Sequence, residues 1–122
     1  MILFLDDNPN RAAIAYQRWS EEKRPYTIWC RTAEEAISVL RDYALTEAHL
    51  GHDLEGETYV DTRREDCGME VVRWLEAQET LDKFNDCVFI CHSWNLSAGN
   101  RMAERLCSLG LKAEHIPFGM TR

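Results

Sequence analysis

The sequence contains no hydrophobic run long enough to cross a membrane. Its apolar stretches are short, and none approaches the roughly 20 residues that a membrane-spanning helix needs. Residues 1–5 are apolar but lack a basic lead-in and end at Asp6-Asp7, so we expect no signal peptide. The five cysteines are odd in number and form no CxxC pair, which argues against a disulfide framework. We therefore expect a cytoplasmic protein with reduced thiols and no membrane partner.

Two common phosphate-handling motifs are also missing. No glycine-rich loop follows the first apolar segment, which argues against a dinucleotide site or a P-loop. Phosphatases with an Asp-x-Asp nucleophile motif need an acid two positions after the first Asp, but here Asn8 stands two positions after Asp6. Any phosphate chemistry must therefore use a different set of residues.

Basic residues are fewer than acidic residues, and the charge is distributed unevenly along the chain. Asp and Glu number 21 against 14 Lys and Arg, which gives a net charge of −7. Residues 1–93 carry −9, whereas residues 94–122 carry +2. A uniformly acidic surface would repel phosphates, so we expect no extended grip on nucleic acid. One end of the chain could still meet a small anion.

Strand-like and helical segments alternate along the whole chain. Five segments have the composition of short strands: 1–5, 26–30, 47–53, 87–91 and 112–117. Helical patterns begin near Asn8-Pro9, Thr32, Asp66 and Ser97, and residues 54–65 predict a long polar loop. Such alternation predicts a parallel sheet with helices on both faces. We expect a single α/β domain over residues 1–122, with no room for a helix after the fifth strand.

Acidic residues follow the first and third predicted strands. The carboxyl ends of parallel strands share one edge of a sheet, where ligands bind. Asp6, Asp7 and Asp53 would meet there, and a divalent cation would relieve the repulsion between their carboxylates. We expect Mg²⁺ or Mn²⁺, with Zn²⁺ as another possibility. The simpler alternative is that Asp7 caps the first helix while Asp6 lies in solvent.

Two histidines follow neighbouring strands at the same edge. His52 and His92 could act as general base and general acid on a phosphate, because imidazole titrates near neutral pH. Together with an Asp they could also bind Zn²⁺. The alternative is a pair of structural histidines. His49 and His115 lack this context, and we expect them to be structural or surface residues.

The segment after the fourth strand suits an anion. Backbone N–H groups at the start of the predicted helix near residue 97 can bind a phosphate group. Ser93 and Asn95 could each add a hydrogen bond, and Arg101 could add charge. Asn95 or Ser97 could also be an ordinary helix cap, which is compatible with this role. Trp94 is the tryptophan placed at the predicted site itself.

These residues carry a family resemblance. The chain resembles a response-regulator receiver domain, in which an acidic pair binds Mg²⁺ and a third Asp accepts phosphate; Asp6, Asp7 and Asp53 match these positions. It is more similar to the cyclic-phosphate-processing receiver-like domain. The segments that carry this similarity are LFLDDNPNR (3–11), GHDLEGETYVD (51–61), CGMEVVRWL (67–75) and HSWNLSAGNRMAERL (92–106). The resemblance implies a five-stranded flavodoxin- or receiver-like fold that lacks the last helix.

The resemblance also implies action on a cyclic phosphate. We expect a metal-assisted phosphodiesterase that hydrolyses a nucleotide 2′,3′-cyclic phosphate, an RNA end of the kind met in RNA repair, or a cyclic nucleotide. His52, His92 and Asp53 form the expected catalytic set. One alternative is a non-catalytic receiver-like module that binds a phosphorylated ligand or partner. Another is phosphate acceptance at Asp53, although the receiver lysine after the fifth strand is replaced by His115 and the residues that follow it.

Overall fold

A computed structural model of the chain describes residues 1–19, 21, 22, 24–54 and 59–120. Strands and helices alternate in it, with short 3-10 turns at Arg24–Tyr26 and Asp82–Phe84. The elements are β1 (Ile2–Leu5), α1 (Pro9–Arg18), β2 (Thr27–Cys30), α2 (Ala33–Asp42), β3 (Glu47–Leu50), α3 (Gly68–Glu76), β4 (Val88–Cys91), α4 (Leu96–Ser108) and β5 (Lys112–His115).

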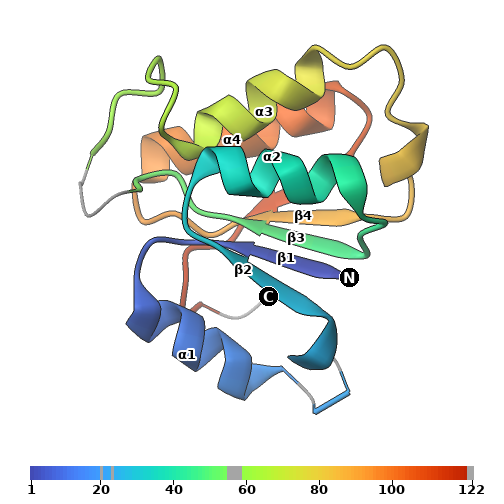
Figure 1. The fold of residues 1–122 in the computed structure, drawn as a ribbon. Coiled ribbons are helices and arrows are strands. Elements are labelled where there is room, and N and C mark those ends of the chain that lie inside the picture. Colours follow the sequence, from blue (N-terminus) through green and yellow to red (C-terminus); the bar gives the residue numbers. More distant parts are fainter. Residues whose placement is uncertain (20, 23, 55–58, 121–122) are drawn as a thin grey trace.

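All five strands form one parallel sheet in the order β2-β1-β3-β4-β5. Helices α2, α3 and α4 cover one face of the sheet, and α1 lies on the other (Figure 1). This is the doubly wound, flavodoxin-like order, which places a ligand crevice between β1 and β3. The predicted fold class, a five-stranded parallel α/β sheet, is confirmed.

The core lies mainly between the sheet and the helices α2, α3 and α4, which cover one of its faces. Leu3, Leu5, Leu50 and Phe89 on the central strands are fully buried there. Because both faces of the sheet are covered, these strands are continuous apolar runs without polar alternation. The central strand ends are therefore held rigidly, and the residues that follow them begin from fixed positions.

The face that carries α1 is completed by the segment after β5. Residues 116–120, the last that the structure describes, contain no helix. The backbone N–H groups of Ile116 and Phe118 donate to the carbonyls of Cys91 and His92 at 2.9 and 2.8 Å. The Phe118 ring lies 6.2 Å from that of Phe4 and 5.9 Å from that of His92. This segment thus packs beside the strand ends, where it helps to bury His92.

Several element boundaries differ from the sequence prediction. β3 covers only Glu47–Leu50 of the predicted segment 47–53, and the backbone bends at His52 and Asp53. Cys67 occupies the cap position of α3, and Asp66 pairs instead with Arg64 at 2.5 Å. Of the predicted loop, residues 55–58 lie outside the described part.

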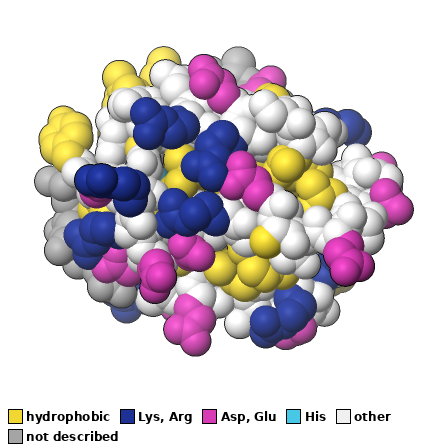
Figure 2. Space-filling view, turned by 90° about the horizontal axis from the view of Figure 1, so that it is seen from above, with side chains coloured by type: hydrophobic (Ala, Val, Ile, Leu, Met, Phe, Trp, Pro, Cys, Tyr) yellow, Lys and Arg dark blue, Asp and Glu magenta, His cyan; other side chains and the backbone are white. Residues whose placement is uncertain are grey.

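The surface over α2, α3 and α4 mixes charges of both signs (Figure 2). Basic side chains gather on one half of this face, with acidic side chains directly beside them. Two of the ion pairs are Arg105 with Glu76, which joins α4 to α3, and Arg73 with Glu70. Among the residues described, no helix is long and apolar enough to span a membrane.

Candidate active site at the carboxyl ends of the central strands

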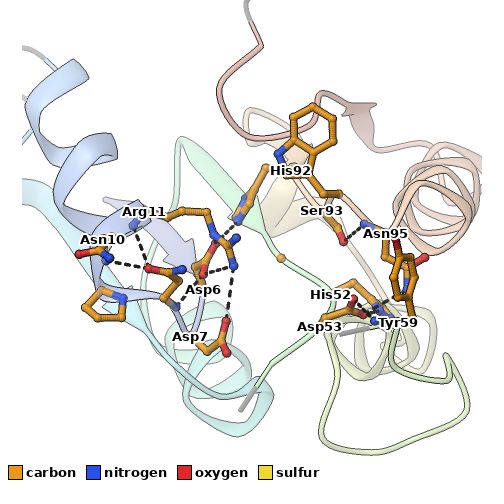
Figure 3. Close-up of a pocket in the computed structure, with 14 residues that line it drawn as sticks. Asp6, Asp7, Asn10, Arg11, His52, Asp53, Tyr59, His92, Ser93 and Asn95 are labelled. Atoms are coloured by element: carbon orange, nitrogen blue, oxygen red, sulfur yellow. Dashed lines mark hydrogen bonds and ion pairs between the residues drawn. The ribbon is translucent and has the colours of Figure 1, made fainter. Parts of the chain in front are cut away.

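A pocket of about 580 Å³ opens where β1, β3 and β4 end. Leu5, Leu50 and Cys91 lie side by side in the sheet, so the next residues, Asp6, Gly51 and His92, form the pocket floor. The lining residues are Asp6, Asp7, Asn8, Pro9, Asn10, Arg11, Gly51, His52, Asp53, Tyr59, His92, Ser93, Trp94 and Asn95. The residues that follow these three strands therefore line one pocket, as expected (Figure 3).

One wall is built around the buried carboxylate of Asp6. The guanidinium of Arg11 donates to both of its oxygens, from Nε at 2.9 Å and from Nη2 at 3.0 Å. His92 Nε2 lies 2.8 Å from Oδ2, and the backbone N–H of Asn8 donates to Oδ1 at 2.8 Å. Burial would raise the pKa of Asp6, but the bonds to His92 and Arg11 outweigh it and lower this pKa. Asp6 is therefore ionised at neutral pH.

His92 is held as a neutral imidazole. Its ring stacks on Phe4 with centroids 4.9 Å apart, and only 5% of its side chain is exposed. Burial lowers its pKa and outweighs the opposing effect of the Asp6 carboxylate. In this state Nε2 donates to Asp6, whereas Nδ1 is buried and has no hydrogen-bond partner.

The opposite wall is built around Asp53. Its Oδ1 accepts from His52 Nδ1 at 2.7 Å, Asn95 Nδ2 at 3.2 Å and the Val60 N–H at 3.1 Å. Its Oδ2 accepts from the Tyr59 N–H at 2.6 Å. Burial would raise the pKa of Asp53, but these four donors lower it. Asp53 is the second ionised carboxylate of the pocket.

His52 is the counterpart of His92 with the opposite pKa shift. Its side chain is wholly buried, which by itself lowers the pKa of His52. The Cys67 side chain and the Asp53 carboxylate raise this pKa by more than burial lowers it, so that the net shift is upward. Cys67 in turn has a lowered pKa: burial opposes this, but His52 and the N–H groups of Met69 and Glu70 outweigh burial. His52 is therefore the histidine that favours the protonated state.

Close packing between β3 and α3 fixes His52 in this place. A Cβ atom on Gly68 would lie 2.0 Å from the carbonyl oxygen of Gly51 and 2.8 Å from the Cα of His52. The N–H of Gly68 also donates to the His52 carbonyl at 2.9 Å. Only glycine allows α3 to begin so close to the strand end, and Cys67 is thereby brought beside His52.

The start of α4 forms the third side of the pocket. The Asn95 side chain accepts from the Ala98 N–H at 3.2 Å, as expected of a helix cap. The same side chain donates to Asp53, and the Asn95 N–H donates to Ser93 Oγ at 3.0 Å. His115 Nε2 donates to the Ser93 carbonyl at 2.8 Å. Asn95 therefore caps α4, and its side chain also contacts Asp53 in the pocket.

The structure brings most of the predicted site residues together. Seven of them line the pocket: Asp6, Asp7, His52, Asp53, His92, Ser93 and Asn95. Arg101 does not line it; this side chain is exposed, and its Nη1 lies 3.4 Å from Thr62 Oγ1. Both imidazoles are almost fully buried, and so is the Asp6 carboxylate, whereas the Asp53 carboxylate is partly exposed.

Sequence reasoning missed two contributors. Arg11 lies four residues after Asp7, one helical turn, so a basic residue there can reach back over the strand end; its Nη2 is 3.6 Å from Asp7 Oδ1. His115 was expected to be structural or at the surface, and it holds the Ser93 carbonyl. Nothing local in the sequence indicates that second contact, which depends on how β5 pairs with β4.

The three predicted metal-binding carboxylates contact other protein groups in the structure. In the described ranges of the chain, no group of three or more His, Cys, Asp or Glu side chains could hold a metal ion. Arg11 occupies both oxygens of Asp6, and four donors occupy those of Asp53. At this edge of the sheet Gly51 lies between Asp6 and His92, and it has no side chain that could bind a metal ion. The guanidinium thus supplies the positive charge that a metal ion would supply to Asp6.

The sheet order and the acidic residues after β1 and β3 define a receiver-like α/β domain. The chain belongs to the cyclic-phosphate processing receiver domain family, whose model matches residues 1–108. The family's description associates it with cyclic-phosphate processing, and receiver domains typically bind Mg²⁺.

A solved structure with a similar fold is the signal receiver domain of a protein described as a Luxo repressor, from Vibrio parahaemolyticus. It has a TM-score of 0.62 and 14% sequence identity, and the match covers 98% of this chain and 78% of that one. At this identity the likeness shows the fold alone. Among curated proteins, none matches the sequence.

Proposed function

We propose that the pocket binds a cyclic phosphate ester and hydrolyses it to a phosphate monoester. One observation carries this proposal: two carboxylate–imidazole pairs, Asp6–His92 and Asp53–His52, face one pocket from opposite walls. Their histidine pKa values are shifted in opposite directions. Paired groups with diverging pKa values are typical of general acid–base catalysis. The family's description supports a cyclic phosphate as the ester.

The pKa directions assign the two roles. A water oxygen bonds to phosphorus, one ring P–O bond breaks, and the released oxygen takes a proton. The Asp6 carboxylate, to which the neutral His92 donates its Nε2–H, accepts the proton of the water. The Asp53–His52 pair, whose imidazole favours protonation, supplies the proton to the released oxygen. Each pair works as a unit because its imidazole and its carboxylate are hydrogen-bonded to each other.

The anion is held by the groups between the two walls. Ser93 Oγ, the Asn95 amide and the exposed part of the Arg11 guanidinium are among the donors that line the pocket. The described lining residues carry one negative charge in excess, counting His52 as protonated. Phosphate binding therefore depends on directed N–H and O–H groups and on the α4 N-terminus rather than on bulk charge. A divalent cation at Asp6 would have to compete with Arg11.

Product analysis tests this function directly. The purified protein is incubated with adenosine 2′,3′-cyclic phosphate and, separately, with adenosine 3′,5′-cyclic phosphate, in EDTA or with Mg²⁺, Mn²⁺ or Zn²⁺. We expect monoester formation, strongly reduced in Asp53→Asn and His92→Gln. His49→Gln is the matched control, because His49 does not line the pocket. No turnover of either ester, or full turnover in both pocket variants, would overturn the proposal.

A second candidate is a binding module without chemistry. The burial of both imidazoles favours it, because little of either ring is exposed to a ligand. Binding of the cyclic nucleotide without product formation would support this candidate. Phosphate acceptance at Asp53 is a third: it predicts labelling by acetyl phosphate that Asp53→Asn abolishes.

A further inference from the structure

Trp94 presents a large aromatic side chain at the mouth of the pocket. It follows Ser93 directly, lines the pocket and is 54% exposed. We infer that Trp94 stacks against the nucleobase of the ligand, so that the substrate is a nucleotide and not merely a cyclic phosphate ester. This inference rests on the proposed phosphate site and names the part of the ligand that lies outside it.

The indole of Trp94 is fixed in place before any ligand arrives. Its Nε1–H donates to the carbonyl of Phe118 at 2.9 Å. The N–H of Phe118 in turn donates to the His92 carbonyl at 2.8 Å. An exposed aromatic ring that is tied at its edge keeps its face free and loses little side-chain entropy when a ligand stacks on it. This is the arrangement expected of a binding platform.

A second exposed aromatic residue lines the same pocket. Tyr59 is 82% exposed and has a backbone φ of 52°, which is unusual for a bulky residue. Its N–H and that of Val60 donate to the two oxygens of Asp53 at 2.6 and 3.1 Å. The carboxylate of the proposed site thus holds this strained turn in place, and Tyr59 lies beside Asp53 and Asn95 in Figure 3. Backbone strain of this kind is common at ligand sites.

The pocket is also larger than a phosphate group requires. Its volume of about 580 Å³ lies in the range of sites for whole small-molecule ligands. The floor is polar, and the exposed aromatic residues Trp94 and Tyr59 add ring surface, which matches a phosphate at one end and a flat base at the other. Because the indole N–H is already bonded to Phe118, Trp94 offers only its face. Stacking of this type tolerates every base, so we expect weak discrimination among bases.

Binding of two ligands that differ only beyond the phosphate tests this inference. Adenosine 2′,3′-cyclic phosphate is compared with glycerol 1,2-cyclic phosphate, which has the cyclic ester but no base. Dissociation constants are measured for the wild type, Trp94→Leu and Trp94→Phe, and circular dichroism checks that each variant is folded. Loss of a stacked base typically costs roughly 1–3 kcal/mol, which corresponds to a weakening of about 5- to 150-fold.

The expected result is a weakening of this size for the nucleotide in Trp94→Leu, near wild-type affinity in Trp94→Phe, and no change for the glycerol ester. Wild-type tryptophan fluorescence should also be quenched by the nucleotide. Equal losses for both ligands, no loss for the nucleotide, or no nucleotide binding to the wild type would overturn the inference. Hydrolysis of both esters at the same rate in wild type and Trp94→Leu would support the proposed function and overturn the stacking role of Trp94. Base-dependent binding without hydrolysis would support the stacking role and overturn the proposed hydrolysis.

Discussion

Replacement of Arg11 by Gln tests whether this guanidinium takes the place of a metal ion beside Asp6. Arg11 donates two hydrogen bonds to a carboxylate that is only 2% exposed, while its own side chain is 35% exposed. Gln keeps a polar side chain but is shorter than Arg and removes the charge. The Asp6 carboxylate would then retain His92 and the Asn8 N–H as its partners.

The cost of this change follows from the burial of the two partners. Removing one member of a fully buried ion pair costs about 3–5 kcal/mol, because the other charge is left without compensation. Exposed pairs contribute about 0–1 kcal/mol. Arg11 lies between these limits, since solvent reaches its outer edge, so we expect the free energy of unfolding to fall by about 2 kcal/mol. Urea denaturation measures this loss, and Arg63→Gln is the matched control, with an 89% exposed arginine whose loss should change little.

Metal ions provide the second measurement on the same variant. Without Arg11 the oxygens of Asp6 become available beside Asp7, and a divalent cation can replace the lost charge. We expect Mg²⁺ or Mn²⁺ to raise the melting temperature of Arg11→Gln and to leave that of the wild type nearly unchanged. Equal stabilisation of both proteins by Mg²⁺, or a loss of unfolding free energy no larger than in Arg63→Gln, would refute the reasoning.

Three further predictions concern the supports of the site. The raised pKa of His52 contributes stability that is complete below its ordinary pKa of 6.5 and is lost as pH rises through the raised value; His52→Gln should therefore flatten the decline in unfolding free energy above pH 6.5, measured by urea titration. Gly68→Ala should cost about 3 kcal/mol or more, because the new Cβ meets the Gly51 carbonyl, and denaturation that shows a loss below 1 kcal/mol would contradict this packing. Asn95→Ala and Thr32→Ala each remove a helix cap and should each cost about 1 kcal/mol, but calorimetry should show weaker nucleotide binding only for Asn95→Ala.

The sequence predicts the state of the cysteines only in part. Their odd number and spacing predicted free thiols, and all five are free in the structure. Burial raises the pKa of Cys87 and of Cys91 to about 12; Cys91 ends β4, and Cys87 directly precedes this strand. Cys67 is different, because the fold places it beside His52 and its pKa is lowered. The sequence carries no local signal for that contact, which joins residues that lie 15 positions apart.

The sequence by itself determined the sheet, its order of elements and the edge at which the polar residues gather. Hydrophobic runs of four or five residues can be buried on both faces only as strands covered by helices, and the carboxyl ends of parallel strands must share one edge. Asp6, Asp53, His92 and Asn95 could therefore be assigned to one pocket from their positions after apolar segments.

Only the tertiary structure decided which partner each of these groups has. Arg11 reaches Asp6 because α1 turns back over the end of β1, and His52 is buried because Gly68 lets α3 begin against β3. Pairings of this kind depend on side-chain direction and on contacts distant in sequence, which local periodicity does not encode. The protonation states follow from those pairings, since burial and neighbouring charge set each pKa. Among the described residues, the predicted acidic cluster contains two carboxylate–histidine pairs, and Arg11 is bonded to Asp6.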